Sequence, residues 1–416
     1  MVDTDEVPSE VGSEVMRGSM KFMWLLLIAS FILAGCKGKS ELNELLIVSS
    51  IGIDQDGEET VVHLQVVNPS GQSNVQGSGS GGTVYTYTES GKTLYDAVKK
   101  VNNILPRKAM FSHVTSIIVG EEYARESGIS MIFDFIERNN QIRDNVAMLV
   151  AKNSKAKDIL SLYTPIFKNP SESLKNRIEI ASATTGISEG ITEREIINWT
   201  YGDQRDPVIL GVERLDLSET GNEMSSLENI NANNKTFKIT GLALFNKDRL
   251  AGWYDDNQTI GWAMVNNRVK EPIIITDECE NEDGYIGFSV KHIKSNVKPL
   301  ITDSEITFQV NISGTAVLQE ITCKMDVSDP KKLIDMEKQI EASMKEDIER
   351  AVEQAKKQKI DVFGFGKLVY EKEPKKWKGK YEKEWESELA NVKVNPVIFI
   401  RMESVGTRVN SIHEKE

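Results

Sequence analysis

ELLIVSSIGID, at residues 44–54, is the segment from which the fold of this chain can be inferred. Its apolar residues predict a buried β-strand, and the turn formers Asp56 and Gly57 come directly after it. The sequence TVVHLQVV, at residues 60–67, then predicts a second strand that returns along the first. We therefore expect the folded part of the chain to begin with a β-hairpin.

The elements expected after this hairpin are strands that alternate with helices. A Gly- and Ser-rich loop at 71–82 precedes a half-buried strand at 83–88. A helix at 92–104 has apolar residues at helical spacing, and Thr93 with Asp96 resembles a capping pair. The next segments are a strand at 114–119, a helix at 129–138 and a strand at 145–151. This order predicts an α+β fold with a mixed β-sheet and flanking helices.

Residues 161–234 have a less distinct pattern, because Pro165, Pro170 and Gly186 interrupt its short helical patches. Its last part, the polar stretch 221–235, is typical of a linker. We therefore expect a multi-domain chain. An N-terminal α+β region would span 37–230, and it could divide into 41–160 and a smaller 161–230 subdomain. A C-terminal α+β domain would span 231–416.

The C-terminal domain is expected to be rich in strands. FKITGLALF and RLAGWY, at 237–245 and 249–254, predict a hairpin around Asn246-Lys247-Asp248. Further strands are expected at 272–276, 284–294, 305–321 and 392–402.

One long helix is expected in this domain, opening at Ser328-Asp329-Pro330, a good N-cap followed by Pro at the first helical position. Its apolar residues recur at steps of three and four, which is the pattern of one straight helix face. They are Leu333, Met336, Ile340, Met344, Ile348, Ala351 and Ala355. A helix of about 27 residues is roughly 40 Å long, enough to cross a whole sheet. Packing on the domain's own sheet is the favoured interpretation, and a partner-binding coiled coil is the alternative.

The composition is that of an ordinary globular protein with an acidic balance. The 416 residues include 63 acidic and 50 basic ones, which gives a formal net charge of −13. Such a surface repels phosphate backbones, so no nucleic-acid partner is expected. It also disfavours adhesion to anionic lipid by charge alone, so a covalent anchor would be more useful.

The N-terminal part of the sequence predicts such an anchor. Residues 22–33 are apolar and uncharged, but twelve helical residues span only about 18 Å, too short for a bilayer and suited to a signal peptide. The segment ends in Leu33-Ala34-Gly35-Cys36, which matches a lipobox. A diacylglyceryl group on Cys36 would hold the chain stably to membrane lipid, on the outer face of a bacterial membrane. The alternative is an ordinary secretory cleavage site with a chance cysteine.

The first 19 residues are acidic, which is unusual for a signal peptide. We therefore expect Met20 to be the true initiator, residues 1–19 to be an extension from an upstream start codon, and residues 20–36 to be the lipoprotein signal peptide.

Two other cysteines, Cys279 and Cys323, lie in or beside expected strands. An exported pair can form a disulfide, but a sequence does not show that the two are within bonding distance. Free buried thiols are the favoured expectation here.

Several short motifs imitate catalytic or binding sites. Ser90-Gly91-Lys92-Thr93 lacks the earlier Gly of a phosphate-binding loop, so a turn and a helix cap explain it better. Asp54, Asp56 and Glu58 lack the Gly and the final Glu of a calcium loop, so we expect a polar hairpin turn there.

No other pattern in the sequence nominates chemistry. The histidines, His63, His113, His292 and His413, are scattered, and we expect no catalytic residues, no cofactor and no metal site. Residues 371–388 interleave Lys with Trp377, Tyr381 and Trp385, but six Glu balance six Lys, so we expect these aromatic side chains to pack inward.

Taken together, these segments resemble the Ger(x)C family of spore germination lipoproteins. The similarity begins after the lipobox with ELNELLIVSSIGID at 41–54 and VVNPS at 66–70, and continues through 90–125 and DNVAMLVAK at 144–152. In the C-terminal half the matching segments are GLALFNKDRLAGW at 241–253, DVFGFG at 361–366 and PKKW at 374–377.

The resemblance implies a function that the residues alone do not give. Members of this family are non-enzymatic C subunits of spore nutrient germinant receptors in the inner spore membrane. They act with an A subunit and a transporter-like B subunit. The alternatives from other classes are a solute-binding lipoprotein of a transporter and a cell-wall hydrolase. The first usually has two lobes of repeated βαβ units, and the second needs convergent carboxylates or a metal site.

Overall fold

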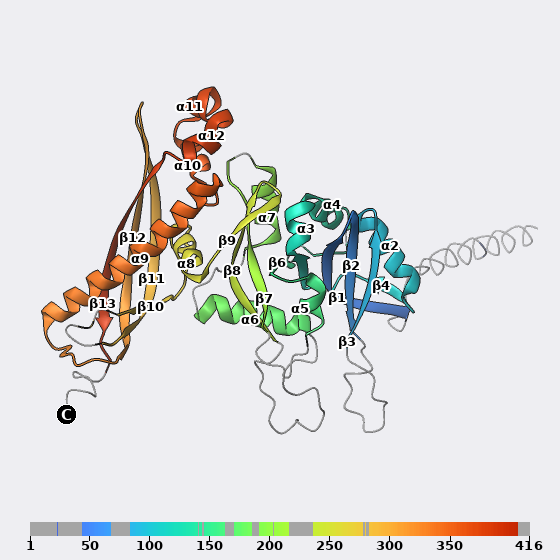
Figure 1. Cartoon of the computed structure of the whole chain (residues 1–416), viewed down its shortest axis with the longest axis horizontal. Coiled ribbons are helices and arrows are strands. Elements are labelled where there is room, and N and C mark those ends of the chain that lie inside the picture. The colour runs from blue at the N-terminus through green and yellow to red at the C-terminus, as the bar shows by residue number, and fades with distance from the viewer. Residues whose placement is uncertain are drawn as a thin grey trace, which may run out of the picture. The chain divides into compact units, whose positions relative to one another are not determined.

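The computed structural model places the chain in two compact units, Met1–Leu45 and Leu46–Glu416. Apart from the first residue of strand β1, every element below lies in the second unit (Figure 1). The residues that the structure describes are 23, 44–67, 84–139, 141–143, 145–162, 170–184, 191–202, 204–215, 236–277, 279 and 283–406.

The first sheet is mixed and contains nine described strands in the order β3-β2-β1-β5-β6-β7-β8-β9, with β4 paired to β1. The expected first hairpin is present, because β1 and β2 are antiparallel. Parallel pairing of β1 with β5, β5 with β6 and β6 with β7 then builds the middle of the sheet. The strands are β1 (Leu45–Asp56), β2 (Glu59–Val67), β3 (Val84–Gly91), β4 (Lys108–Met110), β5 (Ser116–Gly120), β6 (Ala147–Lys152), β7 (Val208–Leu215), β8 (Thr236–Asn246) and β9 (Arg249–Tyr254).

Helices connect and cover these strands. The capping pair expected from the sequence is confirmed, since the Asp96 backbone N–H donates to Thr93 Oγ1 at 3.1 Å at the start of α2. Residues 161–234, which had no clear pattern, contribute two helices, α6 and α7, and strand β7. The helices of this part are α2 (Leu94–Ile104), α3 (Glu121–Glu126), α4 (Ser130–Arg138), α5 (Ala156–Leu160), α6 (Pro170–Thr184) and α7 (Glu193–Tyr201).

The second sheet has four described strands in the order β10-β11-β12-β13. β11 is antiparallel to both of its neighbours, and β13 runs parallel to β12. The strands are β10 (Ile273–Thr276), β11 (Ile286–Ile301), β12 (Ile306–Ile321) and β13 (Lys393–Ser404). With both sheets and their flanking helices in place, the α+β fold class is confirmed.

The long helix α9 (Pro330–Gln358) lies along one face of the second sheet (Figure 1). The predicted apolar face is confirmed. Met336, Ile340, Met344, Ile348, Ala351 and Ala355 are all buried, and Leu333, in the first turn, is partly buried against the core. Packing on the domain's own sheet was the favoured expectation for this helix, and it is the arrangement observed. Helix α8 (Asp256–Val265) also packs against α9, where a Cβ at Gly261 would meet the Asp347 carbonyl oxygen at 2.3 Å. Only glycine allows this close approach of the two helices.

Helix α9 also covers the outer edge of the sheet. The backbone N–H of Ile400 donates to Glu341 at 2.9 Å, and that of Met402 donates to Glu337 at 2.7 Å. These are strand β13 amides at the side away from β12, so two carboxylates of α9 satisfy donors that an edge strand would otherwise expose.

The segment 371–388 is helical. It comprises the end of α10 (Phe365–Lys372), α11 (Pro374–Lys376), a π-helical turn η5 (Trp377–Tyr381) and most of α12 (Glu382–Leu389). Trp377, Tyr381 and Trp385 are buried, which confirms that these aromatic side chains pack inward.

The hairpin β8–β9 pairs with β7 and therefore completes the first sheet. The sequence assigned these residues to the second region, from 231 onward. The division of the chain into domains at 230/231 stays a prediction. Strand β7, before this boundary, pairs with β8, after it, so the sheet continues from one side to the other.

Candidate interaction surface

The motifs that imitate catalytic sites have structural roles. Thr93 caps α2, so Ser90–Thr93 is a turn and a helix cap, as expected. Asp56, Gly57 and Glu58 form the exposed β1–β2 turn, where Gly57 has a φ of 58°. Cys36, the predicted lipidation site, lies outside the described residues, as does His413.

Asp54, the first residue of the motif that resembles a calcium loop, differs from Asp56 and Glu58 because its side chain is buried. Its Oδ1 accepts the Ala156 N–H at 2.8 Å, and Oδ2 accepts the Lys157 N–H at 3.1 Å. His63 Nε2 lies 3.0 Å from the same Oδ2, and His63 Nδ1 lies 2.8 Å from Thr88 Oγ1. This acid–imidazole–hydroxyl chain joins three strands to the start of α5. Both carboxylate oxygens are already occupied, so we interpret the chain as a buried cross-link.

A second buried polar cluster surrounds Asp361, the first residue of the DVFGFG segment. Its carboxylate accepts the Phe365 N–H at 2.9 Å, the Gly366 N–H at 2.6 Å and the Trp385 indole N–H at 2.8 Å. Burial raises the pKa of Asp361, although these three hydrogen bonds favour its ionised form. From the sequence, the segment stands out only by its resemblance. Two of the donors are backbone amides within the segment, and the third is the indole of Trp385, 24 residues further on, so no pattern of residue types marks the cluster.

Asp206 connects this cluster to the first sheet. Its carboxylate accepts the Asp361 N–H at 2.7 Å and the Lys247 N–H at 3.0 Å. Burial raises the pKa of Asp206 to about 6. The neighbouring Arg205 lies 4.2 Å from the Trp199 ring centroid, and burial lowers the pKa of its guanidinium to about 10. This cluster stabilises the packing of α10 and α12 against the β8–β9 hairpin.

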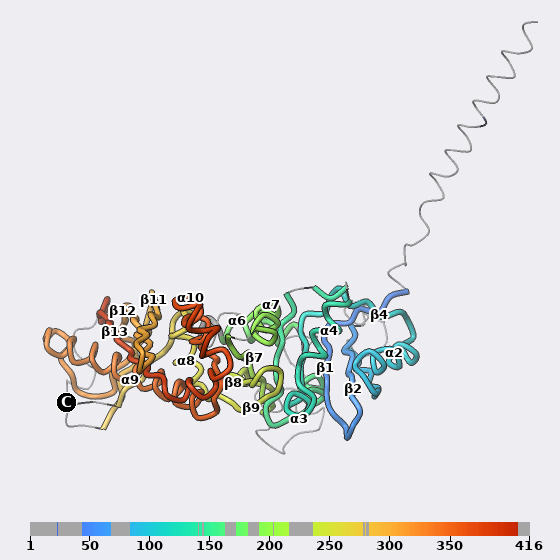
Figure 2. The backbone as a smooth tube through the Cα atoms, turned by 90° about the horizontal axis from the view of Figure 1, so that it is seen from above, coloured from blue at the N-terminus to red at the C-terminus, as the bar shows by residue number. Residues whose placement is uncertain are grey.

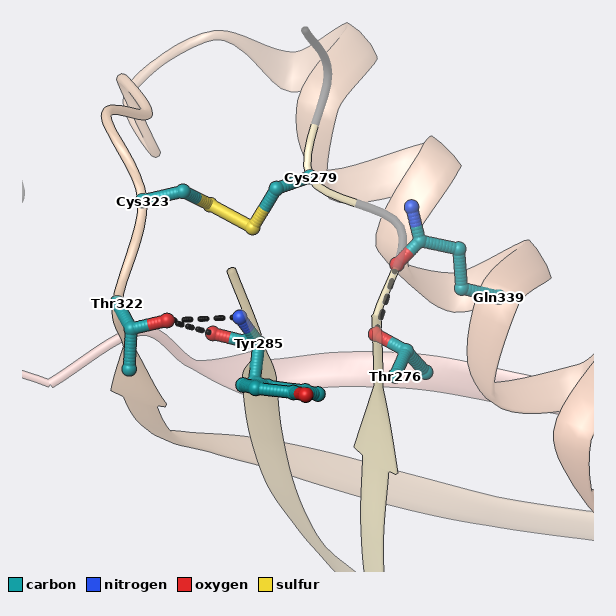
Figure 3. Close-up of a disulfide and its surroundings, with 6 residues drawn as sticks. All are labelled: Thr276, Cys279, Tyr285, Thr322, Cys323 and Gln339. Carbon is teal, nitrogen blue, oxygen red and sulfur yellow. Dashed lines mark hydrogen bonds between the residues drawn. A yellow bond between two sulfur atoms is a disulfide. The ribbon is translucent and has the colours of Figure 1, made fainter. Parts of the chain in front are cut away.

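The two cysteines near the second sheet are bonded to each other. Cys279 and Cys323 form a disulfide (Figure 3), so the expectation of free thiols is wrong. The reason is the strand order: β10 and β12 are both antiparallel to β11, so they run in the same direction and their C-terminal ends lie at the same end of the sheet. Each cysteine follows one of these strand ends. The pairing was therefore predictable only once the order of strands was known.

The sheet face opposite α9 is exposed beside this disulfide. Thr276 points to α9 and donates to Gln339 Oε1 at 3.0 Å (Figure 3), whereas Ile273 and Ile275 point to the other face and are 56% and 65% exposed. Tyr285 is 60% exposed, and its backbone N–H donates to Thr322 Oγ1 at 2.7 Å. We call Ile273, Ile275 and Tyr285 the exposed apolar surface.

This surface lines a shallow open hollow of about 780 Å³. Its polar residues include Glu271, Ser289 and Glu320. Glu271 accepts a hydrogen bond from Ser289 Oγ at 2.7 Å and pairs with Lys291 at 3.2 Å. Large exposed apolar side chains that gather beside ordered polar groups are typical of a surface that binds a protein partner.

Among the described residues, no three or more His, Cys, Asp or Glu side chains gather around one point. Among those same residues, no helix is both long and apolar enough to cross a membrane.

Comparison with known families identifies the chain. Residues 38–214 match the model of the spore germination protein N-terminal domain, and residues 240–406 match that of the spore germination B3/GerAC-like C-terminal domain. The chain belongs to the Ger(x)C family. The two matches span both sheets of the structure, in the order that the sequence resemblance implied.

Individual spore germination proteins are similar to this chain over nearly their whole length. Spore germination protein KC of Bacillus subtilis (strain 168) is 29% identical over 93% of this chain and 96% of its own. The putative spore germination protein YfkR of the same organism is 25% identical over 93% and 97%. Among solved structures, the crystal structure of the GerBC protein covers 85% of this chain and 96% of its own with a TM-score of 0.54. At 16% identity, that likeness supports the fold alone.

Proposed function

We propose that this chain is the lipid-anchored C subunit of a spore nutrient germinant receptor. It would act without chemistry of its own, through contacts with membrane A and B subunits. The observation that carries the proposal is the similarity to spore germination protein KC over 93% of this chain and 96% of that protein.

The anchor is proposed from the sequence. Leu33-Ala34-Gly35-Cys36 would be lipidated on the cysteine, which would hold the chain on the outer face of the cell membrane and of the inner spore membrane. The disulfide supports this assignment, because bonding of Cys279 to Cys323 leaves Cys36 as the third of the three cysteines and gives its thiol no partner within the chain.

We propose that the exposed apolar surface is a contact for a partner subunit. Burial of an Ile side chain removes its apolar area from water and contributes about 1.5–3 kcal/mol. Two such side chains and a Tyr on one sheet face would therefore provide the anchors that a protein interface needs. The ordered pair of Glu271 and Lys291 beside them would give the interface a polar rim.

The receptor role is tested in an endospore-forming host that lacks this gene and any paralogous receptor. The strain is complemented with the wild-type chain or with Cys36→Ala, and dipicolinate release is measured after nutrient addition. We expect the wild type to restore the response to at least one nutrient and Cys36→Ala to restore little of it. If the deletion strain responds normally to every nutrient, the receptor role is wrong. Full rescue by Cys36→Ala would instead remove only the anchor from the proposal.

The contact surface is tested with Ile275→Lys and a matched control, Ile334→Lys. Ile334 is 49% exposed on α9, so the same substitution there places the same charge outside the exposed apolar surface. We expect Ile275→Lys to reduce the germination rate and the recovery of receptor subunits with this chain, because it places a charge where the proposed interface would bury an apolar side chain. Both variants should keep the wild-type melting temperature. Equal germination rates in the two variants would exclude Ile275 from the interface.

A further inference from the structure

The end of the first sheet at which β1 begins carries two exposed cations. β4 pairs with β1, and its first residue, Lys108, follows Arg107. Both side chains are exposed, and no carboxylate of a described residue lies within ion-pair distance of either one. Ile104, at the end of α2, is 47% exposed a few residues earlier. We call Arg107 and Lys108 the basic tip.

The position of the basic tip on β1 follows from the register. β5 pairs with β1 from Ser50 onward, and the Thr115 N–H donates to the Ser49 carbonyl. On that edge of the strand, only the residues before Ser49 remain for β4. The basic tip therefore lies one strand spacing, about 5 Å, from the first residues of β1. Figure 2 shows β4 and the beginning of β1 together at this end of the sheet.

Chain length connects this end to the proposed anchor. Ten residue steps separate Cys36 from Leu46, and a fully extended chain covers at most about 3.5 Å per residue, or about 35 Å in all. A lipid on Cys36 would therefore keep the start of β1 within that distance of the bilayer. The tether contains Lys37 and Lys39 but also Glu41 and Glu44, so its charges balance and the two cations of the basic tip are not part of it.

The distribution of charge favours an anionic lipid surface as the partner of the basic tip. The chain as a whole carries −13, so an anionic bilayer repels most of its surface. Attraction to anionic headgroups falls off within a Debye length, about 8–10 Å, so it acts only on cations that the tether can bring to the surface. An open hollow of about 580 Å³ borders the basic tip and is also lined by Asn102, Asn139 and Gln141. Their amides can donate hydrogen bonds to headgroup oxygens.

We propose that the basic tip docks on anionic phospholipid headgroups and fixes the orientation of the first sheet on the membrane. The inference rests on the proposed lipid anchor at Cys36, which supplies the proximity. The anchor determines that the chain stays at the bilayer, and the tip determines which face of it touches the bilayer.

The test uses the mature chain, residues 36–416, with its disulfide intact, so that Cys36 is the free thiol. The thiol is coupled to a maleimide lipid in vesicles of phosphatidylcholine alone or of phosphatidylcholine with phosphatidylglycerol. Hydrogen–deuterium exchange of the peptide covering residues 104–110 is then followed. We expect slower exchange on the phosphatidylglycerol vesicles only, with the difference lost in high salt.

Arg107→Gln with Lys108→Gln should remove this protection, because each charge near an anionic surface contributes about a five-fold change in binding. The matched control is Lys375→Gln with Lys378→Gln, two exposed lysines of the C-terminal part that have no ion pair among the described residues. This control removes the same charge and should leave the protection unchanged.

Equal exchange on both kinds of vesicle, or equal loss in both double variants, would overturn the proposal. Slower exchange on neutral vesicles as well would show that the tether or Ile104 acts without charge recognition, which overturns it too. Because the coupling supplies the anchor chemically, the result does not depend on lipidation in the cell. Mass spectrometry of the chain from spore membranes tests that lipidation separately.

Discussion

Asp361 shows how much of this fold depends on single buried polar residues. Its carboxylate satisfies two backbone N–H groups of the turn that starts α10 and the indole of Trp385 from α12. Buried donors that lose their acceptor keep the full cost of desolvation, whereas exposed ones regain water. Removing the Asp361 carboxylate would therefore leave three buried N–H groups without an acceptor, and this is the main cost of its loss.

Replacing Asp361 by Ala should lower the free energy of unfolding by on the order of 3 kcal/mol, because three buried N–H groups lose their acceptor. Chemical denaturation monitored by Trp fluorescence would measure the change. Asp335→Ala, at an exposed position on α9, is the control and should change the stability by less than about 0.5 kcal/mol. Similar losses in both variants would contradict the role given to Asp361.

The pKa of Asp206 predicts a dependence of stability on pH. Its folded value, about 6, is above the ordinary value of 3.8, so the folded state holds a proton in a range where the unfolded chain has released it. This stabilisation is complete below about pH 4 and is lost as the pH rises through about 6. The difference is on the order of 3 kcal/mol, from about 1.4 kcal/mol per pKa unit. Asp361 acts in the same direction.

We therefore expect a higher melting temperature near pH 5 than near pH 7. Glu121 and Glu195 have lowered pKa values, so their stabilising contribution is lost only below about pH 4.5 and does not oppose this trend. In Asp206→Asn the increase on acidification should be smaller, since the side chain at 206 no longer titrates. An unchanged increase in that variant would assign the effect to other groups.

At the scale of elements, the sequence was most informative where one segment determines its own structure. The apolar face of α9, the pairing of β1 with β2 and the cap at Thr93 depend on neighbours in sequence, and all were predicted. The attachment of β8 to β7 was not, because strand pairing across residues 216–235 has no local signal. The exposed apolar surface was also missed. The strand at 272–276 was predicted, but its three consecutive Ile do not show which face stays open, and the structure covers one face only.

The start of α9 permits a direct comparison of two capping candidates. The Lys331 N–H donates to Asp329 Oδ1 at 2.9 Å, whereas the Ser328 hydroxyl donates to Asp326 and does not cap the helix. Asp329→Ala should therefore cost about 1 kcal/mol of stability. Ser328→Ala should cost less, and urea denaturation of the two variants would show the difference. The reverse order would mean that Ser328 caps the helix in solution.

At the scale of the whole molecule, the disulfide is the covalent link that local patterns could not show. It joins residues 44 positions apart and closes a loop that contains β11 and β12. Such a bond stabilises mainly by reducing the conformational freedom of the unfolded chain. Its effect should therefore be felt across the second sheet and not only beside the cysteines.

Replacing Cys279 and Cys323 together by Ser should reduce the free energy of unfolding by about 4 kcal/mol, the value expected for a loop of this length. Denaturation of the mature chain with and without reductant would give the same difference for the wild type. The double variant should be insensitive to reductant. If reductant leaves the wild-type stability unchanged, the two thiols are not bonded in the isolated protein.

The carboxylates of Glu337 and Glu341 on the outer edge of β13 have a consequence for the protein at high density. An uncovered strand edge offers its amides as a template on which the strand of another molecule can add, and repetition of that step leads to aggregation. Here two of those amides already have acceptors, and the acceptors carry negative charge that would repel an incoming carbonyl edge. Many copies confined to a small area could thus stay separate molecules, with their second sheets unable to merge through this edge.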